Sequence, residues 1–513
     1  MTLLPSHPIL DCATAAAYEK EVLGEDEREW SAMKRAGVAI ARAVPSELAT
    51  GGTPLAGASL LVLVGKGHNG GDALLAAAEL RRMQPDVSIE VVFVFGERAL
   101  RPLAARAWQQ LQQQASDVRV QRRFEELSRH YTIILDGVFG FQFRAPLQGP
   151  ALRWLENIAP LDAALRVAVD LPSGLGESGA FQADVTLATG ILKRPLLGLS
   201  NAGRIRYLDL GFFEDLTEDS NDRVLLPALL RNLRRLRPAQ SDKRSFGHLC
   251  VIGGSGSFPG AVMMSVQAAV RSGAGLVSAF VPESLAPAFA AACPEAMWTG
   301  CPETPSGALA LDTVSIVRER LDRADAVLVG PGMGRETETL AFVKDLMRLT
   351  SLPLVLDADA LQPDIVWSGS GPRILTPHAG EYARISNGAE LGDFRPTRGS
   401  VTVLKGPVTR VSDGNGVVYH SFEGGPVLAR GGSGDMLAGL IGALVARGMA
   451  SFVRSGRGAP VPSEELYAEL LAAAASGVLW HGRAASLLAA ARGETAVRAT
   501  ELLDYLSPAL AST

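Results

Sequence analysis

The stretch that decides the fold reads Leu60-Leu-Val-Leu-Val-Gly-Lys-Gly-His-Asn-Gly-Gly-Asp72. An apolar run of strand type leads into closely spaced glycines and then into the start of a helix. Its glycines fit the pattern Gly-x-Gly-x-x-Gly, in which the backbone can approach a phosphate and the helix N-terminus supplies free amides. The same glycines are also compatible with a plain tight turn. A dehydrogenase of this type needs an acidic residue about 20 residues further on. Glu97 comes late for that role and follows Gly96, which weakens the dehydrogenase interpretation.

Outward from this stretch, the first half of the chain alternates apolar strands with amphipathic helices. The predicted strands are Leu60–Val64, Ile89–Phe95, Thr132–Leu135 and Val167–Val169, and the predicted helices include Asp72–Met83 and Ala99–Gln114. Such alternation predicts an α/β domain with a mostly parallel sheet that is covered on both faces. In sheets of this kind ligands bind beyond the carboxyl ends of the strands.

A second alternating series follows a break in the pattern near residues 214–245, where an acidic stretch precedes a basic one. Its predicted strands are Leu249–Ile252, Leu276–Val281, Ala326–Val329, Leu354–Leu356, Ile374–Thr376 and Val401–Leu404, and the glycine-rich turn Gly431–Gly434 leads into a helix over Asp435–Ala446. The break predicts a domain boundary near residue 222, which gives domains over residues 1–222 and 223–513.

The composition fits two ordinary globular domains, because single cores stop growing well before 513 residues. The net charge of −5 offers no basic face or tail for a nucleic acid or an acidic membrane. No signal-peptide pattern opens the chain, and no apolar run of the length of a membrane span lacks a charge. Four cysteines without paired spacing fit a reducing compartment. We therefore expect a cytoplasmic protein that binds neither nucleic acid nor membranes, and assembly into a homo-oligomer stays open.

Polar residues follow two further strands of the first half. Ile134-Leu-Asp136-Gly-Val-Phe-Gly140 places an aspartate after a buried strand, and Val169-Asp170-Leu-Pro-Ser173-Gly174 does the same with a fixed turn. A single aspartate in such a place is more often a helix cap. Two of them beside a glycine loop favour a ligand site.

Together with Met33 and Ala36-Gly37, these motifs resemble the NAD(P)HX epimerase domain, the YjeF N-terminal family, over roughly residues 8–215. The resemblance implies a Rossmann-like three-layer fold that binds hydrated NADH or NADPH (NAD(P)HX) and one K⁺ ion. It implies K⁺ ligands at Asn69, Asp136 and Ser173. The implied substrate contacts are His68, Asn69, Gly70, Gly71 and Asp72, then Gly140, Phe141, Gln142, Phe143, Arg144, Ala145 and Pro146, and finally Asp170. His68 replaces the family's first Asn, and Ala73 replaces its Gly.

Epimerisation at a carbon that carries a hydroxyl beside a ring nitrogen requires ring opening, or loss and return of water. Either route needs a proton carrier and control of the charge that develops. Asp170 is the predicted catalytic residue. Lys193 also matches a lysine of the family, and a surface position for it remains an equal alternative.

The second half carries its most informative motif at Gly431-Gly-Ser-Gly434-Asp435. Small residues at a helix N-terminus expose successive amides, which suit a phosphate in transfer. An aspartate in the first turn can accept a proton from an attacking hydroxyl. Asp435 can also be read as a helix cap, but a cap does not require four preceding small residues.

This motif resembles the ribokinase-like superfamily. The wider set, which adds Lys243 to His248, Gly330–Gly334, Leu356–Leu361, Thr376–Glu381 and Leu404–Gly406, resembles the ADP-dependent NAD(P)H-hydrate dehydratase branch, the YjeF C-terminal family, over about residues 223–490. It implies hydrate contacts at Ala261, Gly332, Gly334, His378 and Asp435. It implies adenine-nucleotide contacts at Lys405, Gly406, Pro407, Val408 and Thr409, with Gly431, Gly432, Ser433 and Gly434 around the transferred phosphate.

The chemistry implied for the second half is a phosphorylation that turns a poor leaving group into a good one. Asp435 takes the proton of the ring hydroxyl, ADP with Mg²⁺ phosphorylates it, and phosphate leaves to restore the dihydronicotinamide. The chain as a whole would then epimerise the R and S hydrates and dehydrate the S form. Two alternatives stay open: a small-molecule kinase of ribokinase type with an appended nucleotide-binding domain, and a non-catalytic nucleotide sensor.

Overall fold

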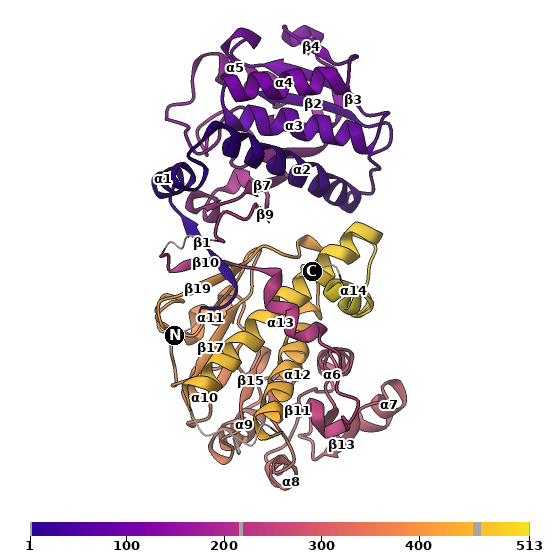
Figure 1. Ribbon diagram of the computed structural model, residues 1–513. Helices are drawn as coiled ribbons and strands as arrows, with labels where there is room; N and C mark the ends of the chain where they lie inside the picture. Colours follow the sequence, from indigo (N-terminus) through magenta and orange to yellow (C-terminus); the bar gives the residue numbers. More distant parts are fainter. Residues whose placement is uncertain (1–2, 215–218, 455–462, 512–513) are drawn as a thin grey trace. The chain divides into compact units, whose positions relative to one another are not determined.

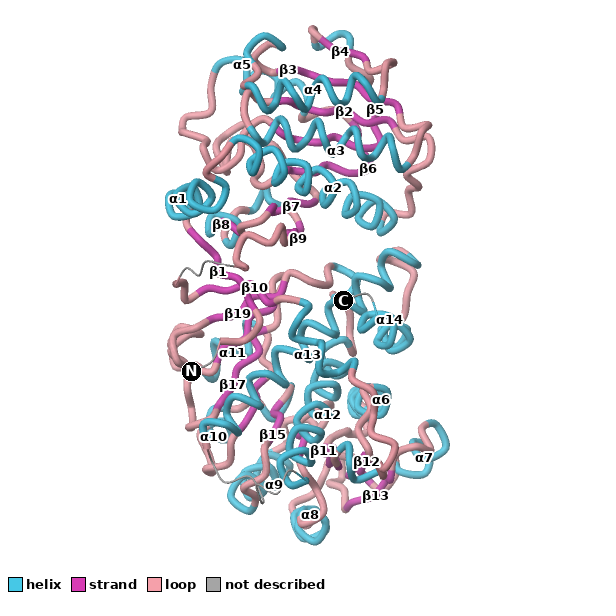
Figure 2. The backbone as a smooth tube through the Cα atoms, in the orientation of Figure 1, coloured by secondary structure: helices cyan, strands magenta, loops and turns pink. Residues whose placement is uncertain are grey.

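The computed structural model describes residues 3–214, 219–454 and 463–511, and these divide into two compact units (Figures 1 and 2). The N-terminal unit comprises His7–Val224 together with Ala489–Ala496. The C-terminal unit comprises Met1–Ser6, Leu225–Leu488 and Val497–Thr513. The chain therefore leaves the N-terminal unit next to the predicted boundary at 222. Each unit also takes a short segment from the opposite end of the chain.

The N-terminal unit is built on a parallel sheet in the order β4-β3-β2-β5-β6-β7-β9. The strands are β2 (Ser59–Val64), β3 (Ser88–Phe93), β4 (Arg119–Gln121), β5 (His130–Gly137), β6 (Asp162–Val169), β7 (Val185–Thr189) and β9 (Arg204–Leu208). The helices are α1 (Cys12–Leu23), α2 (Asp26–Thr50), α3 (His68–Met83), α4 (Pro102–Gln114) and α5 (Gly149–Ile158). The strand order reverses between β2 and β5, and such a reversal opens a crevice at the carboxyl ends of these strands.

Side chains of β2 alternate between two cores, which makes the unit three layers thick. Leu60, Val62 and Val64 pack with α2, α3 and α4 on one face. Leu61 and Leu63 pack with α5 on the other. Figure 2 shows α2, α3 and α4 side by side along the sheet. A strand that is buried on both faces has a continuous apolar sequence, and such a sequence predicts β2.

Gly37 explains why the motif on α2 carries a glycine. A Cβ atom at this position would lie 2.6 Å from the Cβ of Leu75 on α3. The bare backbone therefore lets α2 and α3 approach closely behind the glycine loop. Two short strands, β1 (Ser6–Leu10) and β8 (Leu192–Lys193), pair in parallel beside this region.

The C-terminal unit has a second sheet in the order β13-β12-β11-β14-β15-β16-β17-β18-β19, parallel as far as β17 and antiparallel beyond it. The strands are β11 (His248–Ile252), β12 (Leu276–Pro282), β13 (Met297–Cys301), β14 (Ala326–Val329), β15 (Leu354–Leu356), β16 (Arg373–Leu375), β17 (Ser400–Leu404), β18 (Thr409–Ser412) and β19 (Val418–Ser421). A further strand, β10 (Asp222–Leu225), contains the point in the sequence where the N-terminal unit ends, at Val224, and the C-terminal unit begins, at Leu225.

Helices cover both faces of this sheet as well. They are α6 (Pro259–Arg271), α7 (Ala286–Ala292), α8 (Thr313–Leu321), α9 (Thr337–Leu349), α10 (Pro363–Val366), α11 (Ala379–Ile385), α12 (Ser433–Arg454), α13 (Glu464–Arg492) and α14 (Leu506–Ala511). Cys250 and Ile252 of β11 belong to the core under α8–α11. Leu249 instead contacts α12, where a Cβ on Gly442 would lie 3.0 Å from its side chain.

Helix α12 is apolar because it is a core helix. Its segment Ser433–Phe452 is the one stretch among the described residues that is long and apolar enough to cross a membrane, and 72% of its most apolar window is buried inside the protein. The four cysteines are free, and three of them are buried.

The α/β architecture and the predicted strands of both halves are confirmed, with ends shifted by at most five residues. The predicted strands Ile89–Phe95 and Ile374–Thr376 end early, at Phe93 and Leu375. Helix α3 begins at His68 rather than Asp72, so the glycine motif forms its first turn.

Candidate functional site

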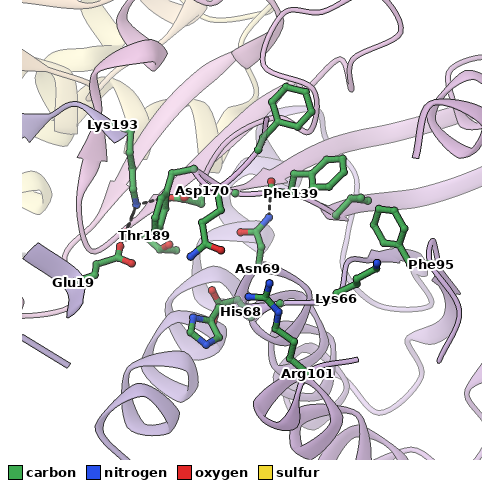
Figure 3. Close-up of a pocket in the computed structure, with 17 residues that line it drawn as sticks. Glu19, Lys66, His68, Asn69, Phe95, Arg101, Phe139, Asp170, Thr189 and Lys193 are labelled. Atoms are coloured by element: carbon green, nitrogen blue, oxygen red, sulfur yellow. Dashed lines mark hydrogen bonds and ion pairs between the residues drawn. The ribbon is translucent and has the colours of Figure 1, made fainter. Parts of the chain in front are cut away.

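A cavity of about 380 Å³ opens where the loops after β2, β5, β6 and β7 meet (Figure 3). The carboxyl ends of these parallel strands lie at one edge of the sheet, so their loops converge. The cavity is lined by Glu19, Lys66, Gly67, His68, Asn69, Asp72, Phe95, Arg101, Val138, Phe139, Gly140, Phe141, Gln142, Phe143, Asp170, Thr189 and Lys193.

Behind the lining residues Asn69 and Phe139 lies a hydrogen-bonded group of oxygen atoms around a buried carboxylate. The Ser173 hydroxyl donates to Asp136 Oδ1 at 2.7 Å, and the Ser173 amide donates to Asp136 Oδ2 at 2.8 Å. The Asn69 amide donates to the Phe139 carbonyl at 2.9 Å, which leaves Asn69 Oδ1 toward Gly140. Burial raises the pKa of Asp136 to about 6, although these hydrogen bonds oppose the shift. The structure thus brings together the three predicted K⁺ ligands.

Near Asn69, the cavity also carries a buried ammonium between two carboxylates. Lys193, only 1% exposed, donates from Nζ to Asp170 Oδ1 at 2.6 Å and lies 3.5 Å from Glu19 Oε1. Burial would lower the pKa of Lys193, but Asp170 and Glu19 more than offset it and raise the pKa. Lys193 is therefore not a surface residue, and the structure decides between the two alternatives for it. Asp170 adopts a φ of 65°, which aims its carboxylate at this ammonium.

The other predicted contacts of the N-terminal unit divide into two groups. His68, Asn69 and Asp72 line the cavity, and so does the segment from Gly140 to Phe143. The remaining predicted contacts lie outside the lining: Gly70 and Gly71, which are buried, and Arg144, Ala145 and Pro146, which are exposed.

Gly70 and Gly71 serve packing. A Cβ on Gly70 would lie 2.5 Å from the Gly65 carbonyl oxygen, and one on Gly71 would lie 2.6 Å from Met33 Sδ. Their missing side chains let the first turn of α3 sit against the loop after β2 and against α2.

Residues that line the cavity without having been predicted as site residues include Glu19, Lys66, Phe95, Arg101, Val138, Phe139 and Thr189. Lys66 lies inside the glycine motif, and its Nζ lies 4.7 Å from the centre of the Phe95 ring. The Arg101 amide donates to the Lys66 carbonyl at 2.9 Å, which places both cations on one side of the cavity. The late Glu97 instead accepts a hydrogen bond from Trp108 at 2.9 Å, a structural role.

Desolvation also acts on Asp72 at the base of the cavity. Burial, followed by the negative charges of Asp170 and Glu19, holds the pKa of Asp72 well above its usual range. The cavity thus contains three carboxyl groups, those of Glu19, Asp72 and Asp170, and one buried ammonium.

The C-terminal unit gathers its polar residues at the carboxyl ends of β14 to β17 and at the start of α12. Lys405 follows β17 and donates to Asp357 Oδ1 at 2.8 Å, and the Thr376 hydroxyl donates to the same oxygen at 2.7 Å. A Cβ on Gly434 would lie 3.3 Å from Lys405 Nζ. The lysine therefore lies directly beside the first turn of α12, which carries Asp435.

The charges of this cluster act on Asp435. Burial, and then repulsion from Asp357, raise the pKa of Asp435 to about 6, while Lys405 lowers it. Burial would lower the pKa of Lys405, but Asp357, Glu381 and Asp435 raise it overall. A carboxyl group with a pKa near neutrality, next to free helix amides, is suited to take a proton from a bound hydroxyl.

Two of the predicted hydrate contacts, Ala261 and Gly332, meet at the first turn of α6. Gly332 has a φ of +64°, and a Cβ there would lie 2.3 Å from the Phe258 carbonyl oxygen and 2.9 Å from the Ala261 side chain. The Ser265 hydroxyl on the same helix donates to the Asp435 carbonyl at 2.9 Å. Gly334 faces open space, and its amide donates to Asp359 at 3.0 Å.

His378 lies in the loop after β16 and caps α11. Its Nδ1 accepts hydrogen bonds from the Gly380 and Glu381 amides at 3.0 and 3.3 Å, while its side chain stays 61% exposed. Its backbone forms a parallel bridge with Lys405. Residues 405–408 form the connection from β17 to β18, and Thr409 is the first residue of β18. Gly431 has no neighbour within 4 Å of an added Cβ, and Gly432 packs against Met264.

His481 on α13 is a buried residue of this region that sequence reasoning missed. Burial lowers its pKa to about 4, and the Ser433 backbone opposes this shift. It is one histidine within a long alanine-rich helix, so no motif marks it. Within residues 3–214, 219–454 and 463–511, no group of three or more His, Cys, Asp or Glu side chains is arranged to hold a metal ion.

Comparisons with known proteins cover both halves of the chain. A family model for the YjeF-related protein N-terminus matches residues 30–195, and one for NAD(P)H-hydrate dehydratase matches residues 249–508. The bifunctional NAD(P)H-hydrate repair enzyme of Moorella thermoacetica is 32% identical, over 87% of this chain and 86% of its own length. That of Gloeobacter violaceus is 36% identical over 81% of this chain and 84% of its own.

Among solved structures, the ADP/ATP-dependent NAD(P)H-hydrate dehydratase of Bacillus subtilis, crystallised with ATP and Mg²⁺, is 24% identical. It covers 56% of this chain and 97% of its own, with a TM-score of 0.45. The two family models and the relatives that align over most of the chain indicate the same family. The chain belongs to the family of bifunctional NAD(P)H-hydrate repair enzymes.

Proposed function

We propose that this chain repairs hydrated NADH and NADPH, with an epimerase site in the N-terminal unit and a dehydratase site in the C-terminal unit. The observation that carries the proposal is that relatives named as bifunctional repair enzymes align over both units. Each unit also presents a cluster of proton-transfer groups at the carboxyl edge of its sheet.

In the epimerase site Asp170 is the proton carrier. Its ion pair with Lys193 keeps a carboxylate available at the cavity wall, and the ammonium can stabilise negative charge on a substrate oxygen. Lys66 and Arg101, at the other side of the cavity, suit the phosphates of a dinucleotide. The aromatic rings of Phe95 and Phe139, whose centres lie 5.7 Å apart, offer a surface for a base.

The group of Asn69, Asp136 and Ser173 fits K⁺. Asp136 is fully buried and receives hydrogen bonds only from neutral donors, so its negative charge lacks a cation. The oxygen-only set with one formal charge suits a weakly charged hard cation better than a transition metal. Bound there, K⁺ would supply the positive charge that this carboxylate lacks and would help to orient the loop from Gly140 to Phe143.

In the dehydratase site Asp435 takes the proton of the ring hydroxyl of the S hydrate. The amides from Gly431 to Gly434 stabilise the phosphoryl group in transfer, and Lys405 adds a positive charge beside Gly434. We expect ADP to bind as the phosphate donor and to bring Mg²⁺ with it, giving AMP and phosphate. Ala261, Gly332, Gly334 and His378 are the proposed contacts to the hydrate.

A small-molecule kinase with an appended domain is not favoured, since both halves match the repair family and its relatives align across them. A sensor without catalysis has no need for the buried charges at both sites. The free cysteines are consistent with the proposed reducing, cytoplasmic compartment.

The test is incubation of the protein with mixed R and S NADPHX, ADP and Mg²⁺, with the restored dihydronicotinamide followed by its absorbance. We expect full recovery of NADPH with one free phosphate for each turnover. Accumulation of a stable phosphorylated product without NADPH would support the kinase instead.

A further inference from the structure

Glu19 is a carboxylate of the epimerase cavity that reaches the site from outside the glycine and aspartate motifs. It lies on α1, near the N-terminus, whereas Asp170 follows β6 and Lys193 ends β8. Glu19 Oε1 lies 3.5 Å from Lys193 Nζ, on the side opposite the cavity's Phe95 (Figure 3). Its side chain is 21% exposed and lines the cavity.

The position of Glu19 is fixed by the packing of α1. Asp11 caps the helix by accepting from the Ala13 and Thr14 amides at 2.9 Å. Tyr18 is buried beside Glu19, and its hydroxyl donates to the Phe212 carbonyl at 3.0 Å. These contacts hold the backbone of α1 at the position from which the Glu19 side chain reaches Lys193.

Glu19 and Asp170 flank the same ammonium in unlike environments. Asp170 makes the close 2.6 Å contact, while Glu19 makes the longer one. Burial raises the pKa of Glu19 to about 6, Lys193 opposes this shift, and Asp170 and Glu29 add to it. Asp72 also faces Glu19 across the cavity. Two carboxyl groups in unlike environments on either side of one ammonium are placed to act as an acid and base pair.

We propose that Glu19 is a second acid–base residue of the epimerisation, working with Asp170 from the other side of Lys193. The inference rests on the proposed epimerase function and names a group that this reaction lacks when Asp170 acts alone. Ring opening must remove a proton from the hydroxyl and supply one to the ring nitrogen, so two groups share the work.

The step balances as follows. Asp170 accepts the hydroxyl proton, the oxygen electrons form a carbonyl, and the bond from this carbon to the ring nitrogen breaks. The electron pair left on nitrogen takes the proton of Glu19. Rotation about the neighbouring single bond turns the other face of the aldehyde to the nitrogen. Closure then returns one proton to Glu19 from nitrogen and the other to oxygen from Asp170, so no oxidant or reductant is needed.

The experiment uses the full chain with Glu19→Gln, which keeps the shape and removes the titration, and Glu19→Asp, which keeps the acid. Glu21→Gln, an exposed residue of the same helix, is the matched control. R and S hydrates are separated by chromatography, without ADP, to measure epimerisation alone. Dehydration of purified S hydrate reports separately on folding and on the second site.

We expect Glu19→Gln to slow epimerisation by about 10²-fold, and Glu19→Asp and Glu21→Gln to stay far closer to the wild type. Wild-type kcat/KM for epimerisation should fall as the pH rises through about 6, where the proton of Glu19 is lost, and this limb should vanish in Glu19→Gln.

Two results would overturn the proposal: Glu19→Gln within a few-fold of wild type, or a slow variant that keeps the same pH limb and so reveals a structural role. A wild-type protein that does not interconvert the hydrates would instead defeat the proposed epimerase function, which keeps the two failures apart.

Discussion

Asp435 is the single residue on which the proposed dehydration depends most. It lies beside Lys405 and the bare amides of the α12 start, and Asn in its place cannot accept a proton. We expect Asp435→Asn to reduce dehydration by about 10²–10⁴-fold, with epimerisation unchanged. The control is Asp364→Asn, because Asp364 is an exposed partner of Lys344. Dehydration by Asp435→Asn within a few-fold of wild type would refute the assignment.

The same residue predicts a pH dependence. Burial and the charge of Asp357 raise the pKa of Asp435 to about 6, and a base works only in its ionised form. The kcat/KM for dehydration should therefore increase as the pH rises through about 6 and level off above it. A profile flat from pH 5 to 8 would mean that another group accepts the proton.

Asp136 predicts an effect of K⁺ on stability as well as on rate. Its pKa in the folded protein, about 6, lies above the ordinary value. The neutral form therefore favours folding at low pH, and this contribution is lost as the pH rises through about 6. K⁺ should raise the thermal-inactivation midpoint of the epimerase at pH 8 and much less at pH 5, relative to tetramethylammonium. Asp136→Asn should remove that difference, and an equal effect of both cations at pH 8 would count against the site.

Sequence reasoning identified the residues that follow parallel strands, because the edge where such strands end is fixed by the topology. Asp136, Asp170 and Ser173 lie where that rule puts them. Glu19 and Arg101 were not predicted, because only the tertiary packing of the chain brings them to the cavity. Gly70 and Gly71 are part of the motif because they allow close packing. A sequence pattern alone does not distinguish this role from contact with a ligand.

At the scale of elements, the contact between α12 and α6 is tight enough to test. A Cβ on Gly439 would lie 2.0 Å from the Ser265 carbonyl oxygen, and this backbone atom cannot move aside cheaply. Gly439→Ala gains about 1 kcal/mol of helix propensity but should lose about 1–3 kcal/mol by overpacking. We expect a net decrease in the free energy of unfolding, measured by urea denaturation, together with faster thermal loss of dehydration.

Gly371→Ala provides the control for this prediction. Its added Cβ would meet nothing closer than 3.4 Å, and its φ lies outside the left-handed region. Equal stability of the two variants would show that the α6 and α12 backbones separate more easily than the distance implies.

Three of the strands that escaped sequence prediction share a position. β4, β9 and β13 are the outer strands of their sheets, and most of their residues are only partly buried. The predicted strands, such as β2 and β14, are buried on both faces and read as apolar runs. Hydrophobic runs reveal the middle of a parallel sheet and leave its edges unmarked.

At the scale of the whole molecule, the proposed sites should act in sequence on one substrate pool. Asp170→Asn should make the reaction of mixed hydrates with ADP and Mg²⁺ biphasic. The S portion should disappear at the wild-type rate, and the R portion should follow only as fast as it converts spontaneously. Wild-type protein should consume both in one faster course.

The dehydratase serves as an internal control in this variant, since the substitution is nearly isosteric. Complete consumption at an undiminished rate would mean that Asp170 is structural or that the dehydratase accepts both epimers. Chromatographic separation of R and S during the time course distinguishes these two outcomes.

The segment Ala489–Ala496 has a consequence for how the protein is made. It belongs to the N-terminal unit, where Glu494 accepts from Arg204 at 2.9 Å, although it is translated after the segment Leu225–Leu488 of the C-terminal unit. Domains usually fold in the order in which the ribosome releases them. Here the contacts of the N-terminal unit are complete only after most of the C-terminal unit has been translated. A protein truncated at the unit boundary would lack Glu494 and its ion pair with Arg204. The N-terminal unit therefore depends on a segment that is translated after most of the C-terminal unit.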